Sequence, residues 1–301
     1  MRAVVLTGYG GVEKLELREV PAPEAGPGAV KVRLTATSVN PIDWKLRSGA
    51  YRQHRPLDFP VILGRDASGE VVATGPGASK FQVGAKVLGL VNAAYAQYVI
   101  ALEGAWAELP ESLDPSDAAA LPLAALTGAQ LIEEAVRPRP GEVVLVTGAV
   151  GSVGRAAVFT ARSRGAEVVA GVRGKQRELA RKLEVDVVAL DEEAEINRLP
   201  RVDAIADTVG GETIQKLLGK VKPGGTVGSL LGEPMGARDR GLAVRAHLTH
   251  PDARRLAALA QAAAAGKLVI PIARRMPLTQ VREAHTLAEK GAGGKIILQV
   301  A

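Results

Sequence analysis

The chain has 301 residues, which is enough for two domains or for one large domain with insertions. Hydrophobic residues make up 47% and charged residues 23%, as in soluble globular proteins, and the absence of cysteine excludes disulfide bonds, thiolate metal sites and a cysteine nucleophile. The formal net charge is +6, but the basic residues are dispersed among acidic ones and aromatic residues are only 3%, so no nucleic-acid partner is expected.

Residues 1–110 have the pattern of a β-rich domain. Six short runs rich in β-branched residues are separated by clusters of glycine and proline, which is typical of a small antiparallel barrel or sandwich. The runs cover residues 3–8, 14–20, 29–39, 67–75, 85–91 and 96–101.

From about residue 115 the apolar period becomes helical. A helix is predicted over residues 116–136, and the prolines and glycine of the following segment, 137–142, end it. Strands and helices then alternate, and apolar strands separated by helices are typical of a doubly wound parallel sheet. The predicted strands are 142–147, 166–172, 185–190, 202–209 and 225–231, and the predicted helices are 152–164, 176–183 and 212–220.

The end of the chain returns to short β-like runs. An alanine-rich helix is expected over residues 252–265, followed by apolar runs at 267–273 and 294–300, which we expect to rejoin the first domain. The sequence therefore predicts an α/β protein with a β-rich domain at residues 1–112, a doubly wound domain at 113–262 and a C-terminal return at 263–301.

A glycine-rich turn joins the first strand of the predicted parallel sheet to its helix. The segment Ala149-Val150-Gly151-Ser152-Val153-Gly154 matches the G-x-G-x-x-G fingerprint with alanine in the first position. Gly151 lets the backbone approach a pyrophosphate, Gly154 lets the helix pack closely on the strand, and the helix N-terminus attracts phosphates. A tight turn without a ligand would use the same glycines, but the position at the first strand of a β/α series favours dinucleotide binding.

The turn has a superficial likeness to that of the short-chain dehydrogenases, which also require a Tyr-x-x-x-Lys pair later in the chain. All four tyrosines precede the turn, at positions 9, 51, 95 and 98. The short-chain class is therefore excluded.

Six segments match another family in order along nearly the whole chain: residues 38–51, 60–75, 121–132, 144–154, 206–211 and 294–298. With a β-rich domain ahead of the cofactor domain, the chain resembles the medium-chain dehydrogenase/reductase superfamily, and within it the zinc-free quinone oxidoreductase (zeta-crystallin-like) branch. The resemblance implies a GroES-like β-rich catalytic domain and a Rossmann domain that binds a nicotinamide cofactor.

The resemblance also bears on metal binding. Zinc alcohol dehydrogenases of the superfamily carry cysteine where this chain has Asn40, and Gly-His-Glu where it has Gly64-Arg65-Asp66. Without thiolates, and with His54 the only histidine before residue 247, the usual three ligands of a catalytic zinc are missing, so no metal is expected. Hydride transfer to a conjugated acceptor, whose own carbonyl stabilises the developing charge, is then the expected chemistry.

A set of cofactor contacts follows from the resemblance. Thr127 matches the family's nicotinamide-side threonine, and the ends of two strands are expected to line the ligand crevice. The full expected set is Asn40, Asp43, Thr127, Val150, Gly151, Ser152, Val153, Gly154, Arg173, Lys175, Arg177, Asp207, Val209, Leu230, Leu231 and Gly232.

The second strand of the predicted parallel sheet indicates which nicotinamide cofactor is bound. NAD enzymes place a carboxylate about 20 residues past the glycines, where it binds the ribose 2′-hydroxyl and repels a 2′-phosphate. Here Arg173 stands at that place, with Lys175 and Arg177 behind it, and no acidic residue lies between Glu167 and Glu178. A guanidinium binds a phosphate bidentately, so NADPH is expected; the alternative is that these basic residues are only a solvated loop.

Asn40 and Tyr51 are the candidate catalytic residues. By resemblance they line the nicotinamide and substrate pocket, Asn40 with an amide donor and Tyr51 with a phenol that can donate to an enolate or quinol oxygen. The same spacing of Asn-Pro, Asp and Gly-x-Tyr occurs in enoyl-thioester reductases, where the tyrosine is a catalytic donor. The alternatives are that Tyr51 packs at the cleft rim and that Asp43 only begins a helix.

Three functions remain open from the sequence. The first is an NADPH-dependent, zinc-independent quinone oxidoreductase, the second a reductase of α,β-unsaturated ketones or enoyl thioesters, and the third a nucleotide-binding protein without activity. The expected partner is a small quinone or conjugated carbonyl compound, with no membrane partner and with a homodimeric assembly. The apolar run at the N-terminus is too short for a signal peptide, so a cytoplasmic location is expected.

Overall fold

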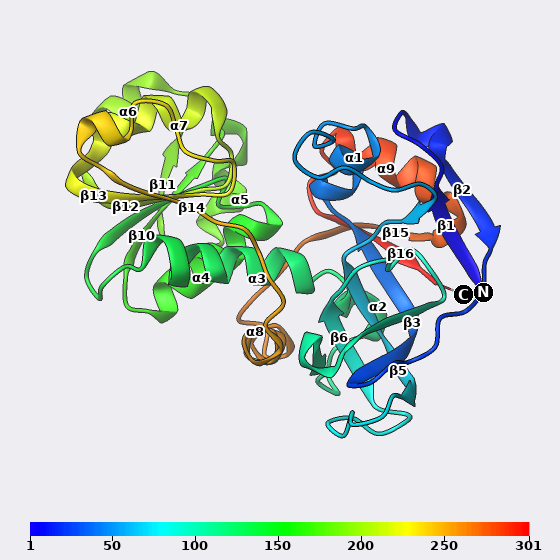
Figure 1. The fold of residues 1–301 in the computed structure, drawn as a ribbon. Coiled ribbons are helices and arrows are strands. Elements are labelled where there is room, and N and C mark those ends of the chain that lie inside the picture. The colour runs from blue at the N-terminus through cyan, green and yellow to red at the C-terminus, as the bar shows by residue number, and fades with distance from the viewer. Residues whose placement is uncertain (301) are drawn as a thin grey trace. The chain divides into compact units, whose positions relative to one another are not determined.

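The chain folds into two compact units, which are described separately. The structure is a computed structural model that describes residues 1–300. The first unit combines Met1–Leu123 with the segment that begins at His250, and the second unit is Ala124–Thr249 (Figure 1).

The first unit is built on two β-sheets. One sheet has the strand order β2-β1-β4, and the other has the order β15-β16-β3-β5-β6-β8, with β7 paired to β3. All pairings are antiparallel except that of β15 with β16. The strands are β1 (Arg2–Leu6), β2 (Leu15–Glu19), β3 (Ala29–Val39), β4 (Val61–Ile62), β5 (Asp66–Thr74), β6 (Lys86–Leu90), β7 (Tyr98–Leu102), β8 (Trp106–Glu108), β15 (Ile272–Pro277) and β16 (Lys295–Gln299).

Alternation along β3 explains how the first unit forms its core. Val30, Val32 and Leu34 are buried against Trp106 in one apolar cluster, whereas Arg33 between them is exposed. This period of two is what a strand with one buried face requires. At its far end β3 pairs with β16, with Val39 opposite Ile296, so the C-terminal segment is part of the same sheet.

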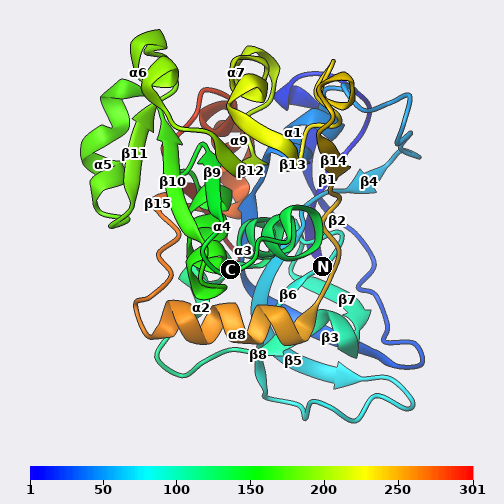
Figure 2. The same ribbon diagram turned by 90° about the vertical axis from the view of Figure 1, so that its left-hand side faces the viewer.

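Four helices belong to the first unit: α1 (Pro41–Arg47), α2 (Pro115–Ala118), α8 (Ala253–Ala264) and α9 (Val281–Glu289). Asp252 begins α8 by accepting a hydrogen bond from the backbone N–H of Arg255, a helix N-cap. The helix α8 packs beside β8 (Figure 2). The second unit thus ends before α8 begins.

The second unit is a six-stranded parallel sheet with the order β11-β10-β9-β12-β13-β14. The predicted doubly wound α/β fold is confirmed. Its elements are β9 (Val143–Thr147), α4 (Ser152–Ser163), β10 (Glu167–Val172), α5 (Arg177–Arg181), β11 (Asp186–Ala189), α6 (Glu193–Arg198), β12 (Val202–Asp207), α7 (Gly211–Leu217), β13 (Val221–Ser229) and β14 (Ala243–Ala246).

Helices cover both faces of this sheet. Val144 and Val146 of β9 pack in one apolar cluster with residues of α4, and Leu145 packs in another with residues of α6 and α7. Figure 1 shows α4 and the pair α6 and α7 on opposite sides of the strands. Strands buried on both faces account for the continuous apolar runs in the sequence.

The helix predicted over residues 116–136 is divided. Its first part is α2, and α3 (Pro122–Gln130) begins anew and continues as a π-helical turn, Leu131–Val136. Pro122 has no backbone N–H to continue a helix but suits a first helical position, so it marks the restart. The turn ends at Arg137, which has a left-handed φ of 54°.

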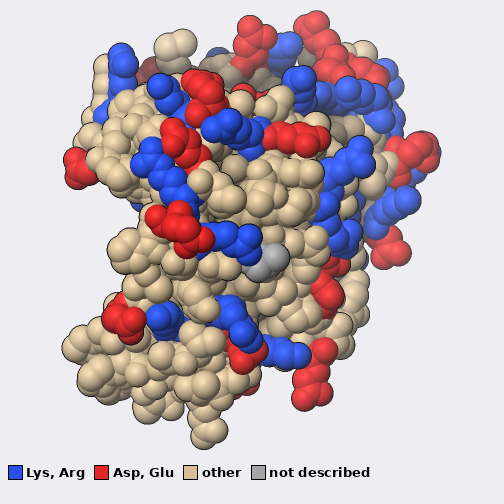
Figure 3. Space-filling model, turned by 90° about the vertical axis from the view of Figure 1, so that its right-hand side faces the viewer, with Lys and Arg blue, Asp and Glu red and all other residues tan. Residues whose placement is uncertain are grey.

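The surface of the protein carries mixed charge. On the face shown in Figure 3, lysine and arginine side chains are interspersed with aspartate and glutamate. No helix among residues 1–300 has the length and apolar character needed to cross a membrane.

Candidate nucleotide site and buried polar cluster

The glycine-rich turn of the second unit joins β9 to α4. Gly148 has a φ of +64°, a conformation that favours glycine, and Gly151 is the N-cap of α4. A Cβ on Gly154 would lie 2.1 Å from the carbonyl oxygen of Gly148, so only glycine fits the present backbone there. The close contact seats the first turn of α4 directly above the end of β9.

This turn fits a dinucleotide pyrophosphate. The first N–H groups of an α-helix have no acceptors within the helix, and they lie at its positive end. Val150, Gly151, Ser152, Val153 and Gly154 supply the backbone of this end, and the Gly151 N–H already donates to the Gly148 carbonyl at 2.9 Å. Arg155 follows them, and its Nε donates to the carbonyl oxygen of Val150 at 3.1 Å, which braces the turn.

The basic residues expected to bind a 2′-phosphate differ in their surroundings. Arg173 directly follows β10, and it and Lys175 are exposed and form no ion pair within residues 1–300. Arg177 is already paired with two glutamates, with Glu192 at 3.2 Å and with Glu195. Arg173 and Lys175 therefore remain the candidates for an anion.

Asp207, expected beside the adenosine half of the cofactor, is fully buried and has its own partners. Its carboxylate accepts hydrogen bonds from the Thr147 hydroxyl at 2.9 Å and the Ser229 hydroxyl at 3.0 Å. It also accepts from the backbone N–H groups of Val209 at 3.1 Å and Gly210 at 2.9 Å. Asp207 thus shapes the loop after β12 and has little capacity left for a ligand.

The other expected contacts lie at the carboxyl ends of strands or on α3. Val209 and Leu231 are apolar yet 45% and 48% exposed, and both follow the carboxyl end of a strand of the parallel sheet. Leu230 and Gly232 flank Leu231 after β13. Thr127 on α3 is buried, and its hydroxyl is 2.7 Å from that of Thr249.

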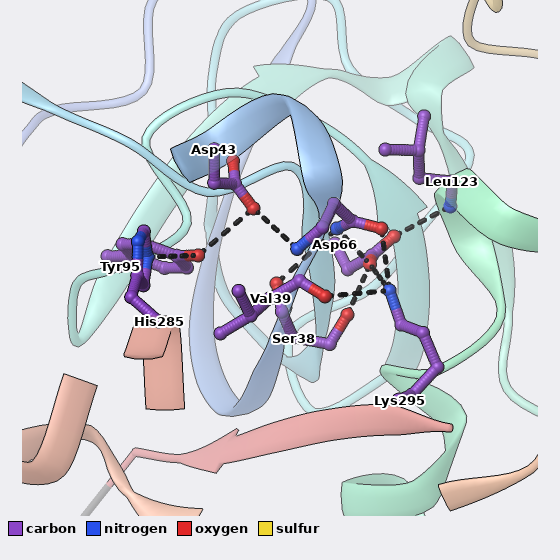
Figure 4. Close-up of polar contacts among 9 residues, drawn as sticks. Ser38, Val39, Asp43, Asp66, Tyr95, Leu123, His285 and Lys295 are labelled. Atoms are coloured by element: carbon purple, nitrogen blue, oxygen red, sulfur yellow. Dashed lines mark hydrogen bonds and ion pairs between the residues drawn. The ribbon is translucent and has the colours of Figure 1, made fainter. Parts of the chain in front are cut away.

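In the first unit the expected residues Asn40 and Asp43 belong to a buried polar cluster (Figure 4). Asn40 precedes α1, and its backbone N–H donates to the Asp43 carboxylate at 2.8 Å, which ties the helix to the end of β3. The Asn40 side chain donates to Asp66 at 2.7 Å and accepts from the Lys295 ammonium at 2.6 Å. A weaker bond from the same amide to the Ser38 carbonyl, at 3.4 Å, engages its second hydrogen. The amide donor expected to face a substrate is therefore used within the protein.

Asp43 lies at the end of a chain of hydrogen bonds. The Tyr95 hydroxyl donates to its carboxylate at 3.0 Å and lies 3.2 Å from Nε2 of His285. On its other side Nδ1 of His285 faces the Arg47 guanidinium at 3.4 Å, and Arg47 pairs with Glu289. One carboxylate oxygen of Asp43, Oδ1, is buried without a partner within residues 1–300. A buried acceptor without a donor is costly, so this atom fits a ligand or water that donates to it.

Burial sets the proton affinities in this chain. Burial, and to a lesser extent the charge of Asp66, raise the pKa of Asp43 to about 6, against the opposing effect of the hydrogen bonds from Asn40 and Tyr95. Burial and the Arg47 charge lower the pKa of His285 to about 3, so its imidazole is neutral. Burial and Asp43 raise the pKa of Tyr95. With Nδ1 accepting from Arg47, His285 donates from Nε2 to Tyr95, and every hydrogen points toward Asp43.

Tyr51, the other candidate catalytic residue, stands apart from these bonds. It follows α1, is partly buried, and packs at the edge of the apolar cluster that contains Tyr95. Its hydroxyl forms no hydrogen bond within residues 1–300, and the Lys45 ammonium lies 5.8 Å from its ring centre. The phenol is thus free to donate to another molecule.

Sequence reasoning missed Asp66, Tyr95, His285 and Lys295 as members of the cluster. Asp66 and Lys295 both lie in segments that match the family, but they are 229 positions apart in the chain. No local pattern joins residues so far apart, and only the pairing of β16 with β3 brings them together.

Comparisons with known proteins now define the family. Residues 26–111 match the model of the alcohol dehydrogenase GroES-like domain, and residues 183–298 match that of the zinc-binding dehydrogenases. The quinone oxidoreductase of Pongo abelii is 30% identical over 325 aligned positions, which cover 99% of this chain and 97% of the relative. The solved structure of the quinone oxidoreductase from Coxiella burnetii, 27% identical, superimposes with a TM-score of 0.90 and covers 100% of this chain and 99% of that one.

The two-domain fold and these matches define a member of an oxidoreductase superfamily. The chain belongs to the medium-chain dehydrogenases/reductases, among the quinone oxidoreductases, which confirms the resemblance found in the sequence. Enzymes of this superfamily bind a nicotinamide nucleotide. A further relative, the chloroplastic quinone oxidoreductase QR1 of Triphysaria versicolor, is 33% identical over 198 residues. This alignment covers 62% of the present chain and 60% of the length of QR1.

The zinc implied by one family description does not fit the residues present. Within residues 1–300 no group of three histidine, cysteine, aspartate or glutamate side chains is close enough to hold a metal ion. Arg65 points its guanidinium at the Asn92 side chain, 2.6 Å away. Asp66, the only carboxylate among the matched positions, is already occupied by four donors. A guanidinium, an amide and a saturated carboxylate are not the ligands of a catalytic zinc.

Proposed function

We propose that this protein is an NADPH-dependent, zinc-independent oxidoreductase that transfers a hydride from NADPH to a quinone. The glycine turn with the Gly148–Gly154 contact is the observation that carries the proposal, because it leaves a helix N-terminus open to a pyrophosphate. When bound, NADPH supplies the hydride, and the protein has to bind it, orient it and exclude water.

NADPH is preferred over NADH because of the residues after β10. Arg173 and Lys175 are exposed without ion-pair partners within residues 1–300, and the sequence has no carboxylate at the end of this strand. The acidic residues nearby are engaged: Asp191 accepts the Gly174 N–H at 2.7 Å, and Glu192 pairs with Arg177. An unpaired guanidinium can bind a 2′-phosphate through a charge-assisted, bidentate contact, which a neutral 2′-hydroxyl cannot form.

A quinone is the proposed acceptor, and the chain offers a proton donor for it. A quinone that accepts a hydride becomes a quinol anion, whose oxygen then needs one proton. The Tyr51 hydroxyl is the candidate donor, since it has no partner within residues 1–300 and its proton can be replaced from solvent. The relatives named quinone oxidoreductase support this acceptor class.

The same phenol favours a second candidate, the reduction of α,β-unsaturated ketones or enoyl thioesters. Hydride addition to their β-carbon leaves an enolate, and Tyr51 is equally suited to donate to that oxygen. The third function left open by the sequence, a nucleotide-binding role without catalysis, has no observation in its favour. The homodimer and the cytoplasmic location stay predictions from the sequence.

The test is a steady-state assay of NADPH and NADH oxidation with a panel of quinones, enones and enoyl thioesters. We expect quinones to give the highest kcat/KM with NADPH. An enone or thioester that exceeds every quinone would select the second candidate, and no oxidation with any acceptor would select the third.

The same assay tests the cofactor assignment through Arg173→Asp. The substitution places a carboxylate against the 2′-phosphate, so the Kd for NADPH should rise roughly tenfold or more, which is about 1.4 kcal/mol, while NADH binds equally well or better. Arg201→Asp, an equal change of charge at another exposed arginine of the second unit, is the control. If Arg173→Asp leaves the NADPH preference intact, the 2′-phosphate is bound elsewhere.

A further inference from the structure

The Lys295–Asp66 ion pair lies inside the first unit, at the starts of β16 and β5. The Asp66 side chain is fully buried and that of Lys295 is 6% exposed, with 3.0 Å between the ammonium and Oδ2 of the carboxylate.

Every polar hydrogen of the Lys295 ammonium has an acceptor. Besides Asp66 these are the Asn40 side-chain oxygen at 2.6 Å and the Val39 carbonyl at 3.4 Å. Lys295, on the neighbouring strand β16, therefore holds the end of β3 and the residue before α1 through hydrogen bonds. The Asn40 amide closes a ring by donating to Asp66 at 2.7 Å.

Asp66 in turn receives donors from separate elements. Oδ2 accepts from Asn40, Lys295 and the Ser38 hydroxyl, and Oδ1 accepts from the backbone N–H of Leu123 at 2.6 Å. Leu123 is in the first turn of α3, and Figure 4 shows its amide reaching Asp66 from above, whereas Lys295 lies below. Pro122 has no backbone N–H, so Leu123 supplies the first N–H donor of α3.

Two helices that carry expected site residues are thus tied to one carboxylate. Asn40 links it to α1, which carries Asp43 and leads to Tyr51, and Leu123 links it to α3, which carries Thr127 one turn further on. Burying a carboxylate is costly unless a cation is paired with it and its oxygens accept hydrogen bonds. Lys295 supplies that cation.

We propose that Lys295 is a positioning residue for the reductase reaction: it holds Asp66 so that this one carboxylate sets the start of α1 and the start of α3. The inference rests on the proposed function. Stability alone does not explain a buried ion pair. Burying two charges is costly, and neutral side chains of similar shape often replace such a pair without loss of stability.

The test separates positioning from charge compensation with the double variant Asp66→Asn/Lys295→Met. Lys295→Met alone leaves an unpaired buried carboxylate and is expected to fold poorly. The double variant removes both charges and should melt close to the wild type. With Lys295 gone, the Asn40 side chain loses its hydrogen bond to β16, so kcat should fall roughly tenfold or more while the Kd for NADPH stays within about threefold.

A readout without turnover accompanies the assay. Amide hydrogen exchange at Leu123 should be roughly tenfold faster or more in the double variant, because the hydrogen bond to residue 66 is no longer held. Lys290→Met, at an exposed lysine that follows α9, is the matched control and should change neither quantity.

The outcomes are distinguishable. If the double variant keeps kcat within about threefold and Leu123 exchanges as in the wild type, Lys295 only neutralises Asp66 and the proposal is wrong. If the wild type shows no turnover with any acceptor, the proposed function fails, and the exchange of Leu123 alone decides whether Lys295 positions α3.

Discussion

Asp43 is the residue at which burial and hydrogen bonding oppose each other most clearly. Its carboxylate is 1% exposed, and two donors serve Oδ2 while Oδ1 has none within residues 1–300. Arg65 and Lys295 carry positive charges near it, and Asp66 carries a negative one. Burial outweighs these interactions and raises the pKa to about 6. Asp43 is therefore ionised at neutral pH but takes up a proton in mild acid.

This balance predicts how stability depends on pH. Asp43 holds a proton in the folded state at pH values where the unfolded chain, with a pKa of 3.8, has released it. Its contribution is fully present below about pH 4 and is lost as pH rises through about 6, so the wild type should lose stability relative to Asp43→Asn over this range. A difference of about 2–3 kcal/mol is the expected upper limit.

Chemical denaturation of both chains at several pH values measures this difference. Asp58→Asn, at an exposed carboxylate, is the control and should give a pH-independent difference. His285 contributes in the opposite sense, because its lowered pKa costs stability as pH falls from 6.5 toward 3, but it is present in both chains and cancels. A constant difference between wild type and Asp43→Asn would show that Asp43 has an ordinary pKa.

At this scale the sequence predicted which residues lie together only where they are neighbours in the chain. Asn40 and Asp43 are joined through the start of α1, and the turn residues through the start of α4, as their spacing indicated. The partners that decide their chemistry, Lys295 and His285, come from the far end of the chain. Asn40 is an example: the sequence alone could not show that its amide donates hydrogen bonds within the protein.

At the scale of elements, the absence of a side chain on Gly154 sets how closely α4 packs on the end of β9. Gly154 lies in the first turn of α4, and the 2.1 Å separation between its would-be Cβ and the Gly148 oxygen leaves no room for a methyl group. Gly148 directly follows β9 and Gly154 is part of α4, so the sheet and the helix hold the backbone on both sides of this contact. The open N-terminus of α4 therefore depends on this contact.

Gly154→Ala should widen the turn and weaken nucleotide binding. The methyl group must push α4 away from β9, so we expect the Kd for NADPH to rise roughly tenfold or more and the melting temperature to fall by a few degrees, about 1–2 kcal/mol. Gly219→Ala, where a Cβ would meet no atom within 4 Å, is the control. An unchanged Kd in Gly154→Ala would mean that the turn does not hold the nucleotide.

Elements with strong periodicity were predicted and short ones were not. The long strand β3 and the helix α4 have clear alternation or helical period in the sequence. The short elements α6 and β14 were missed, because segments of six and four residues carry too few apolar positions to show a period. The break at Pro122 was overlooked because the apolar character continues across it.

At the scale of the whole molecule, the residues at the positions of the zinc ligands are not suited to bind zinc. We therefore predict that activity is independent of zinc. Exhaustive dialysis against a chelator should leave kcat unchanged, and elemental analysis of the purified protein should find no stoichiometric zinc. The physical reason is that Arg65 is a permanent cation at one matched position and that Asp66, at another, already accepts four hydrogen bonds. Stoichiometric zinc whose removal abolishes activity would contradict the prediction.

The pairing of β16 with β3 has a consequence for the order in which the protein is made. Ribosomes deliver the chain from its N-terminus, so β3 and Asp66 emerge before β16, the strand that pairs with Val39, and Lys295, whose ammonium pairs with Asp66, emerges 229 residues after Asp66. All residues of the Ala124–Thr249 unit are available before then. Until β16 arrives, a nascent chain exposes an unpaired edge of β3 and leaves the Asp66 carboxylate in water. The first unit, which starts before the second in the chain, is therefore completed after it during synthesis.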